Sequence, residues 1–106
     1  MNLKTQIIGT WILIEHSEID ENLVGSLVYS ADNKMSVHIT GKINGEEILI
    51  KYSGSYSLHP GFITHKVDIS DNPKRIGTEQ KRFVQLTGNL MTLTDETNFK
   101  AVWVKQ

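Results

Sequence analysis

The sequence predicts an all-β fold of about eight antiparallel strands, and three observations point to it. In the stretch Glu46–Leu58, apolar residues and Gly54 alternate with lysine and serine, as in a long strand with one buried and one solvent-facing side. The dipeptide Asn44-Gly45 suits the positive φ angles of a two-residue hairpin turn. Short turn segments separate the other strand-like stretches, and none has the periodicity of an amphipathic helix. We expect the strands to close into an up-and-down barrel, because a sandwich would leave strand edges exposed.

The expected strands are short segments rich in strand-forming residues and bounded by residues typical of turns. A short polar lead precedes them. They comprise Ile7–His16, Leu23–Ser30, Lys34–Ile43, the long Glu46–Leu58, Phe62–Ser70, Gly77–Leu86, Leu90–Thr94 and Asn98–Lys105. We expect the polar loop Asp71–Ile76 to be solvated or to border the mouth of the barrel. Within the long strand, Gly54 has no side chain and therefore predicts a sharp bend or a β-bulge.

The bulk composition fits one small domain over residues 1–106. Eleven basic and twelve acidic side chains nearly cancel, so no basic surface argues for nucleic acid or an anionic membrane. There is no cysteine, which excludes disulfides, a thiolate nucleophile and a cysteine zinc site. The apolar run Ile7–Ile14 has only Lys4 before it and no cleavage site after it, so we interpret it as a strand rather than a secretion signal. The expected location is therefore the cytoplasm.

The tripeptide Gly9-Thr10-Trp11 in the first strand resembles the Gly-x-Trp signature of lipocalins. Further stretches follow in the order found in the bacterial lipocalin-like domain proteins, and the chain resembles that family over nearly its whole length. These stretches are Gly25–Ser30, Met35–Val37, Tyr52–Tyr56, Thr64–Val67, Gly77–Gln80, Arg82 and Val102-Trp103. The resemblance implies a small antiparallel barrel, with the Trp11 indole closing one end beside the last strand. It also implies structural roles for Gly9, Trp11, Gly54 and Trp103.

Two features differ from the family pattern. The hairpin Asn44-Gly45 replaces the longer insertion that family members usually carry between the third and fourth strands. Lys66 and Lys105 stand where the family often has a second histidine and an arginine. The resemblance therefore supports neither a histidine-pair site nor a Trp–Arg stack at the closed end.

His65 is the strongest single candidate for a functional residue. It shares its face of the strand with Ile63, Val67 and Ile69, so the imidazole is expected to point inward. A buried neutral imidazole can donate from one nitrogen and accept at the other, and its usual pKa suits proton transfer near neutral pH. A core histidine bonded to a carbonyl or a tyrosine hydroxyl is the ordinary interpretation. A ligand contact or a general base is the alternative.

Arg82 has the same parity as Val84 and Leu86 and is therefore also expected to face the core. A guanidinium is rarely buried without a carboxylate, carbonyl groups or an anionic ligand to satisfy its donors. Glu79, the nearest acid in sequence, has the opposite parity. The alternatives are an internal ion pair, a half-exposed arginine at the rim, and a contact to a carboxylate or enolate ligand.

Tyr29, Tyr52 and Tyr56 are expected on the inner faces of their strands. Inward tyrosines offer apolar area and a hydroxyl that needs a partner, which suits both a packed core and a pocket for a flat small molecule. With His65 and Arg82 they form the candidate ligand-binding set. The remaining histidines lack the spacing of metal ligands, and the chain has no phosphate loop or nucleophile elbow. We therefore expect neither a metal nor a cofactor.

Three functions are compatible with these residues. The leading hypothesis is a barrel that binds a small hydrophobic or aromatic ligand in a cavity of at least roughly a few hundred Å³, the lower end of usual ligand pockets. The second is a cofactor-free cyclase or isomerase that uses an interior histidine or tyrosine, supported only by analogy between folds. The third is a packed module without a ligand that forms a homodimer through an apolar wall, at Phe83 or at one side of Phe99–Val104. No catalytic residue can be assigned from the sequence.

Overall fold

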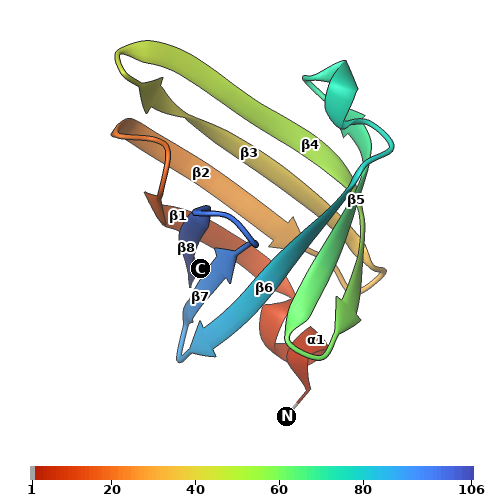
Figure 1. The fold of residues 1–106 in the computed structure, drawn as a ribbon. Helices are drawn as coiled ribbons and strands as arrows, with labels where there is room; N and C mark the ends of the chain where they lie inside the picture. Colours follow the sequence, from red (N-terminus) through yellow and green to blue (C-terminus); the bar gives the residue numbers. More distant parts are fainter. Residues whose placement is uncertain (1) are drawn as a thin grey trace.

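Eight antiparallel strands close into one barrel in the computed structural model, which describes residues 2–106 (Figure 1). Each strand pairs with its neighbours in sequence, and the first pairs with the last to complete the ring. The elements are α1 (Leu3–Ile7), β1 (Gly9–His16), β2 (Glu21–Tyr29), β3 (Lys34–Ile43), β4 (Glu46–His59), β5 (Phe62–Ser70), the 3-10 turn η1 (Pro73–Arg75), β6 (Glu79–Thr87), β7 (Leu90–Thr94) and β8 (Lys100–Lys105). The all-β antiparallel barrel that the sequence predicts is confirmed.

The turn residues locate the strand ends well. β3, β5 and β7 have the predicted bounds, and the other strands differ from prediction by one or two residues at one or both ends. The hairpin between β3 and β4 has positive φ angles of 51° at Asn44 and 82° at Gly45, as its sequence predicts. β6 begins at Glu79 rather than Gly77, because Gly77 has a φ of 84° and belongs to the preceding turn.

Helix α1 corrects the expectation of a polar lead followed by a strand from Ile7. The Asn2 side chain accepts a hydrogen bond from the Thr5 N–H at 2.9 Å and caps the helix, while Ile7 is fully buried. Leu3 and Ile7 have helical spacing, but this signal spans a single turn and the apolar run that follows obscures it. Neither α1 nor η1 is long or apolar enough to cross a membrane, and residues 2–106 contain no other helix.

The register between β4 and β5 changes at Gly54. Ser53 pairs with Ile69 and Gly54 with Val67, so Asp68 has no partner on β4 and forms a β-bulge. A Cβ atom at Gly54 would overlap the carbonyl oxygen of Lys66, so the two backbones approach as closely as a glycine allows. The bulge that Gly54 predicts is confirmed.

The bulge also overturns the expected orientation of Ile69. Alternation from His65 through Val67 predicts an inward Ile69, but the extra residue at Asp68 reverses the parity and leaves Ile69 69% exposed. Ser70 is now the residue paired with the inward Tyr52. The pattern of one strand could not reveal this, because the extra residue is defined only by the pairing with β4.

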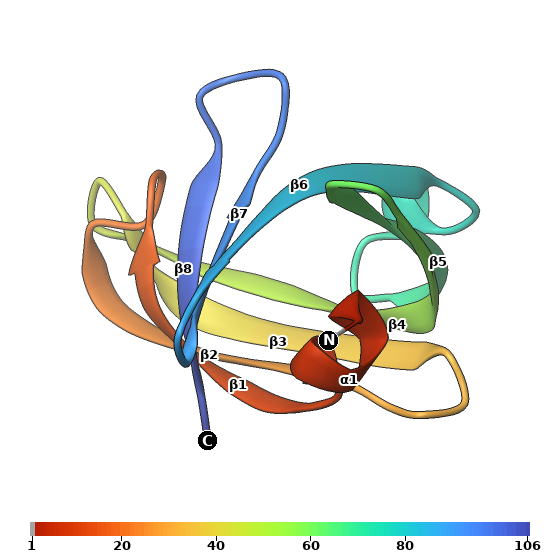
Figure 2. The same ribbon diagram turned by 90° about the horizontal axis from the view of Figure 1, so that it is seen from below.

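Helix α1 lies at the bottom of the barrel in Figure 1, and Figure 2 shows the same end from below. The Trp11 indole is 1% exposed and donates from Nε1 to the Ile7 carbonyl at 2.8 Å. Lys105 of β8 pairs with Trp11, and its Nζ lies 5.6 Å from the indole centroid and donates to the Gln6 carbonyl at 3.0 Å. A lysine therefore makes the cation–π contact that closes this end.

We expect Gly54→Ala to lower the free energy of unfolding by about 3 kcal/mol or more, because the new methyl group would meet backbone rather than a movable side chain. Urea denaturation measures this change. Ser55→Ala, the next residue of the same strand, is the matched control and should alter stability by about 0.5 kcal/mol at most. A Gly54→Ala protein as stable as this control would contradict the close approach of β4 and β5.

Candidate ligand-binding site

The barrel contains a cavity of about 240 Å³. Its apolar lining includes inward residues of five strands, namely Leu27, Val37, Ile39, Ile50, Leu93, Ala101 and Trp103. Its polar lining includes Tyr52, His65, Arg75, Gln80, Arg82 and Asp95. Polar and apolar groups thus make up similar shares of the cavity wall, which suits a ligand that has both an apolar and a polar part.

Three of the five candidate residues line this cavity, namely Tyr52, His65 and Arg82. Tyr29 and Tyr56 lie outside the lining and contact each other, with ring centroids 4.9 Å apart. The Tyr56 hydroxyl donates to the Ser30 carbonyl at 2.6 Å. Tyr56 is therefore held by a hydrogen bond to the backbone. Tyr29 does not line the cavity itself, but it contacts His65, which does.

A hydrogen bond joins Tyr29 and His65, with the hydroxyl oxygen 2.6 Å from Nε2 and both side chains almost fully buried. His65 is the only hydrogen-bond partner of the Tyr29 hydroxyl within residues 2–106. We therefore assign the hydroxyl as the donor, which places the proton of the imidazole on Nδ1. Nδ1 is itself buried without a partner in the described chain, so a donor remains unused beside the cavity.

Burial keeps this pair uncharged at neutral pH. It lowers the pKa of His65 to about 3, with a smaller contribution from the charge of Arg82. It also raises the pKa of Tyr29 well above its usual value and raises the pKa of Tyr52. The aromatic part of the site is therefore neutral, and the charges of the lining lie on residues such as Arg75, Arg82 and Asp95.

Arg82 reaches the cavity from β6, on the face that its parity predicts. Its guanidinium carbon lies 4.7 Å from the centroid of the Phe99 ring. Nη1 donates to the Lys81 carbonyl at 3.0 Å, and Nη2 donates to Oε1 of Gln80 at 3.4 Å. Arg82 has no ion pair with a carboxylate of residues 2–106, and Glu79 is exposed on the outer face. The structure therefore contains the half-exposed arginine and not the internal ion pair.

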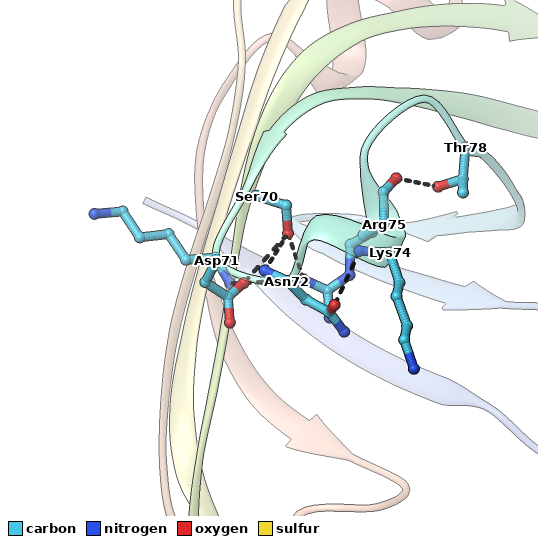
Figure 3. Close-up of polar contacts among 7 residues, drawn as sticks. Ser70, Asp71, Asn72, Lys74, Arg75 and Thr78 are labelled. Atoms are coloured by element: carbon cyan, nitrogen blue, oxygen red, sulfur yellow. Dashed lines mark hydrogen bonds and ion pairs between the residues drawn. The ribbon is translucent and has the colours of Figure 1, made fainter.

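Arg75 is a lining residue that the sequence did not single out. Its Nη1 donates to Ser70 Oγ at 2.7 Å and to Asp71 Oδ1 at 2.9 Å, as Figure 3 shows, and its guanidinium carbon lies 5.5 Å from the Tyr52 ring centroid. The local signal is the pair Asn72-Pro73. The Asn72 side chain accepts from the Lys74 N–H at 3.0 Å and Pro73 starts η1, as expected of an Asn-Pro turn.

Trp103 packs in the core, as expected of a structural residue, and it also contacts the cavity. The indole lines the cavity, is 3% exposed, and has no partner for Nε1 within residues 2–106. The equivalent nitrogen of Trp11 donates to a carbonyl. A buried donor without an acceptor costs about 1–3 kcal/mol, so an acceptor on a bound molecule would be favoured here.

His16 borders the cavity together with Phe99, and their ring centroids lie 5.4 Å apart. Its Nδ1 accepts a hydrogen bond from the Glu18 N–H at 3.1 Å, and burial lowers its pKa. No group of three or more His, Cys, Asp or Glu side chains in the described part of the chain could hold a metal ion. His16 and Phe99 together form an aromatic part of the cavity wall.

The fold and the cavity define a small antiparallel barrel with room for a compact ligand. The family model of the lipocalin-like domain matches residues 43–106, and the chain belongs to this family. Five solved chains are similar in structure. One is an uncharacterized protein from Bacteroides eggerthii DSM 20697, with 18% identity and a TM-score of 0.62 over 94% of this chain and 99% of that chain. This similarity shows the fold alone. A comparison with curated proteins gives no match.

We expect acid to destabilise the protein through His65. The folded-state pKa of about 3 lies below the ordinary 6.5, so the unfolded state binds more protons between these values and stability falls as pH decreases through them. The full contribution is present above pH 6.5. Between pH 6.5 and about 4.5 the wild type should lose about 2 kcal/mol of unfolding free energy that His65→Gln does not lose.

Urea denaturation at several pH values measures this difference. His38→Gln is the matched control, because it removes an imidazole that is exposed on the outer face of β3. Parallel pH profiles for wild type and His65→Gln would show that His65 titrates alike in the folded and unfolded chains.

Proposed function

We propose that this protein binds a small hydrophobic or aromatic ligand inside the barrel, and that it does so in the cytoplasm. The observation that supports this most is the cavity of about 240 Å³, whose wall is about half apolar. Well-packed interiors contain few voids larger than a water molecule, and an apolar cavity of about 150 Å³ is enough to bind benzene. The space here suits one ring or a short chain with a few substituents.

The electrostatics of His65 favour binding over catalysis. A general base works best when its pKa lies near the working pH, and burial lowers the pKa of His65 to about 3. The pKa of Tyr29 is shifted in the opposite direction, because burial raises it well above the usual value. Both groups serve better as neutral hydrogen-bonding groups than as proton carriers. This supports a binding protein ahead of a cyclase or isomerase.

Self-association is a second candidate, favoured by an apolar row on the outer wall. Ile12 of β1 pairs with Val104 of β8, which pairs with Leu90 of β7, so the three side chains lie side by side. Ile12 and Leu90 are each 37% exposed. Phe99 and Trp103 face the interior instead, so this row is the exposed apolar side of the last strand. A second copy of the chain is the partner that we propose for it.

Native mass spectrometry of protein purified from its own host tests the binding proposal. We expect a retained small molecule in wild type and its loss in Ala101→Leu, because residue 101 lines the cavity and the larger side chain fills it. Val102→Leu, the next residue of the same strand, is the matched control and should keep the ligand. An unliganded wild type that also binds no aromatic probe would end the proposal.

Sedimentation velocity at micromolar concentration tests self-association. We expect a dimer for wild type and a monomer for Val104→Lys, because a charge in the middle of the row would have to be desolvated on association. Val24→Lys, which replaces a 67% exposed valine of β2 outside this row, should leave the dimer intact. A wild-type monomer at every concentration would rule out this wall as an interface.

A further inference from the structure

Arg82 is a charged residue of the cavity whose charge no carboxylate of the described chain neutralises. The ion pairs within residues 2–106 are Arg75–Asp71 at 2.9 Å and Lys100–Glu15 at 3.2 Å. A guanidinium has five N–H donors, and Arg82 makes two hydrogen bonds, both to neutral oxygens. Arg82 is half-exposed at the cavity, and its remaining N–H donors are therefore available to an anionic group of a ligand.

The guanidinium is nevertheless held in place. Phe99 lies 4.7 Å from its carbon, and the side chain of Gln80 and the carbonyl of Lys81 accept from its two terminal nitrogens. A group positioned before binding loses little conformational freedom when the ligand arrives. Arginine binds a carboxylate through two parallel N–H···O bonds, and its planar shape makes it selective for that geometry.

Asp95 lines the same cavity, but its carboxylate is hydrogen-bonded within its own turn. Its Oδ1 accepts from the Thr97 N–H at 2.7 Å and from Thr97 Oγ1 at 2.6 Å. These hydrogen bonds are the main reason that the pKa of Asp95 is lowered, and the charge of Arg82 contributes less. The acids Asp95 and Glu18 in the lining would repel a ligand with two negative charges more than one with a single charge.

The cavity size and the unpaired charge together define a ligand class. We propose that the ligand is a small organic monocarboxylate, with its apolar body in the cavity and its carboxylate bound by Arg82. This deepens the proposed interior binding function and rests on it. The volume of about 240 Å³ fits a single aromatic ring with a short carboxylate arm. The unpartnered Nε1 of Trp103 offers a donor for a further oxygen on such a molecule.

The test compares two compounds of nearly equal shape, 3-phenylpropanoate and the neutral 3-phenylpropanamide. Tryptophan fluorescence follows binding, because Trp103 lines the cavity. We expect wild type to bind the carboxylate about tenfold more tightly than the amide. Arg82→Gln should weaken binding of the carboxylate about tenfold and leave binding of the amide unchanged. Unchanged amide binding also shows that the variant is folded.

Lys81→Gln is the matched control for net charge. It removes the same unit charge one residue away, but the Lys81 ammonium lies on the outer face, 4.5 Å from the Phe62 ring centroid and 5.0 Å from that of Phe83. It should not change the preference for the carboxylate. Equal binding of the two compounds, or a carboxylate affinity unaffected by Arg82→Gln, would overturn the assignment to Arg82 and leave interior binding standing. Binding of neither compound would overturn both.

Discussion

The close approach of β4 and β5 at Gly54 is the constraint on which the mouth of the cavity depends. Because a glycine faces the backbone of Lys66, the two strands can come together and Asp68 is displaced as a bulge. The bulge reverses the parity of the last part of β5, so Ser70 rather than Ile69 is aligned with Tyr52. Ser70 then accepts a hydrogen bond from Arg75 at 2.7 Å. The absence of a side chain at Gly54 thus contributes to placing Arg75 over the ring of Tyr52.

The two sides of the cavity differ in charge: the buried aromatic side is neutral, and the side of Arg82 is positively charged. Tyr29 and His65 form a neutral hydrogen-bonded pair, since burial disfavours the charged form of both. Arg82 stands apart from this pair, stacked on Phe99 and without a carboxylate partner in residues 2–106. Such a gradient suits a ligand with an apolar body and one polar end. The low pKa of His65 has two causes, burial first and the charge of Arg82 second.

The candidate site could be predicted from sequence in part. Strand parity correctly placed Tyr52, His65 and Arg82 at the interior, because side-chain direction alternates along a regular strand. Parity also placed Tyr29 and Tyr56 inward, and both are buried, but whether an inward residue lines a cavity depends on the packing of its neighbours. Arg75 was predicted only as part of a loop that could border the mouth of the barrel, and not as a lining residue in its own right. It lies in a loop, where no periodicity exists and only the turn signal of Asn72-Pro73 was available.

What the sequence by itself determined is the set of features that arise from neighbours along the chain. These are the alternation that makes strands, the Asn44-Gly45 hairpin, and the glycine that demands a bulge. The tertiary structure alone decided on which strand the extra residue lies and how large the cavity is. It also decided which polar groups inside remain without partners, namely His65 Nδ1 and Trp103 Nε1 within the described residues. The physical reason is that each of these depends on distances between strands far apart in sequence, which no local pattern encodes.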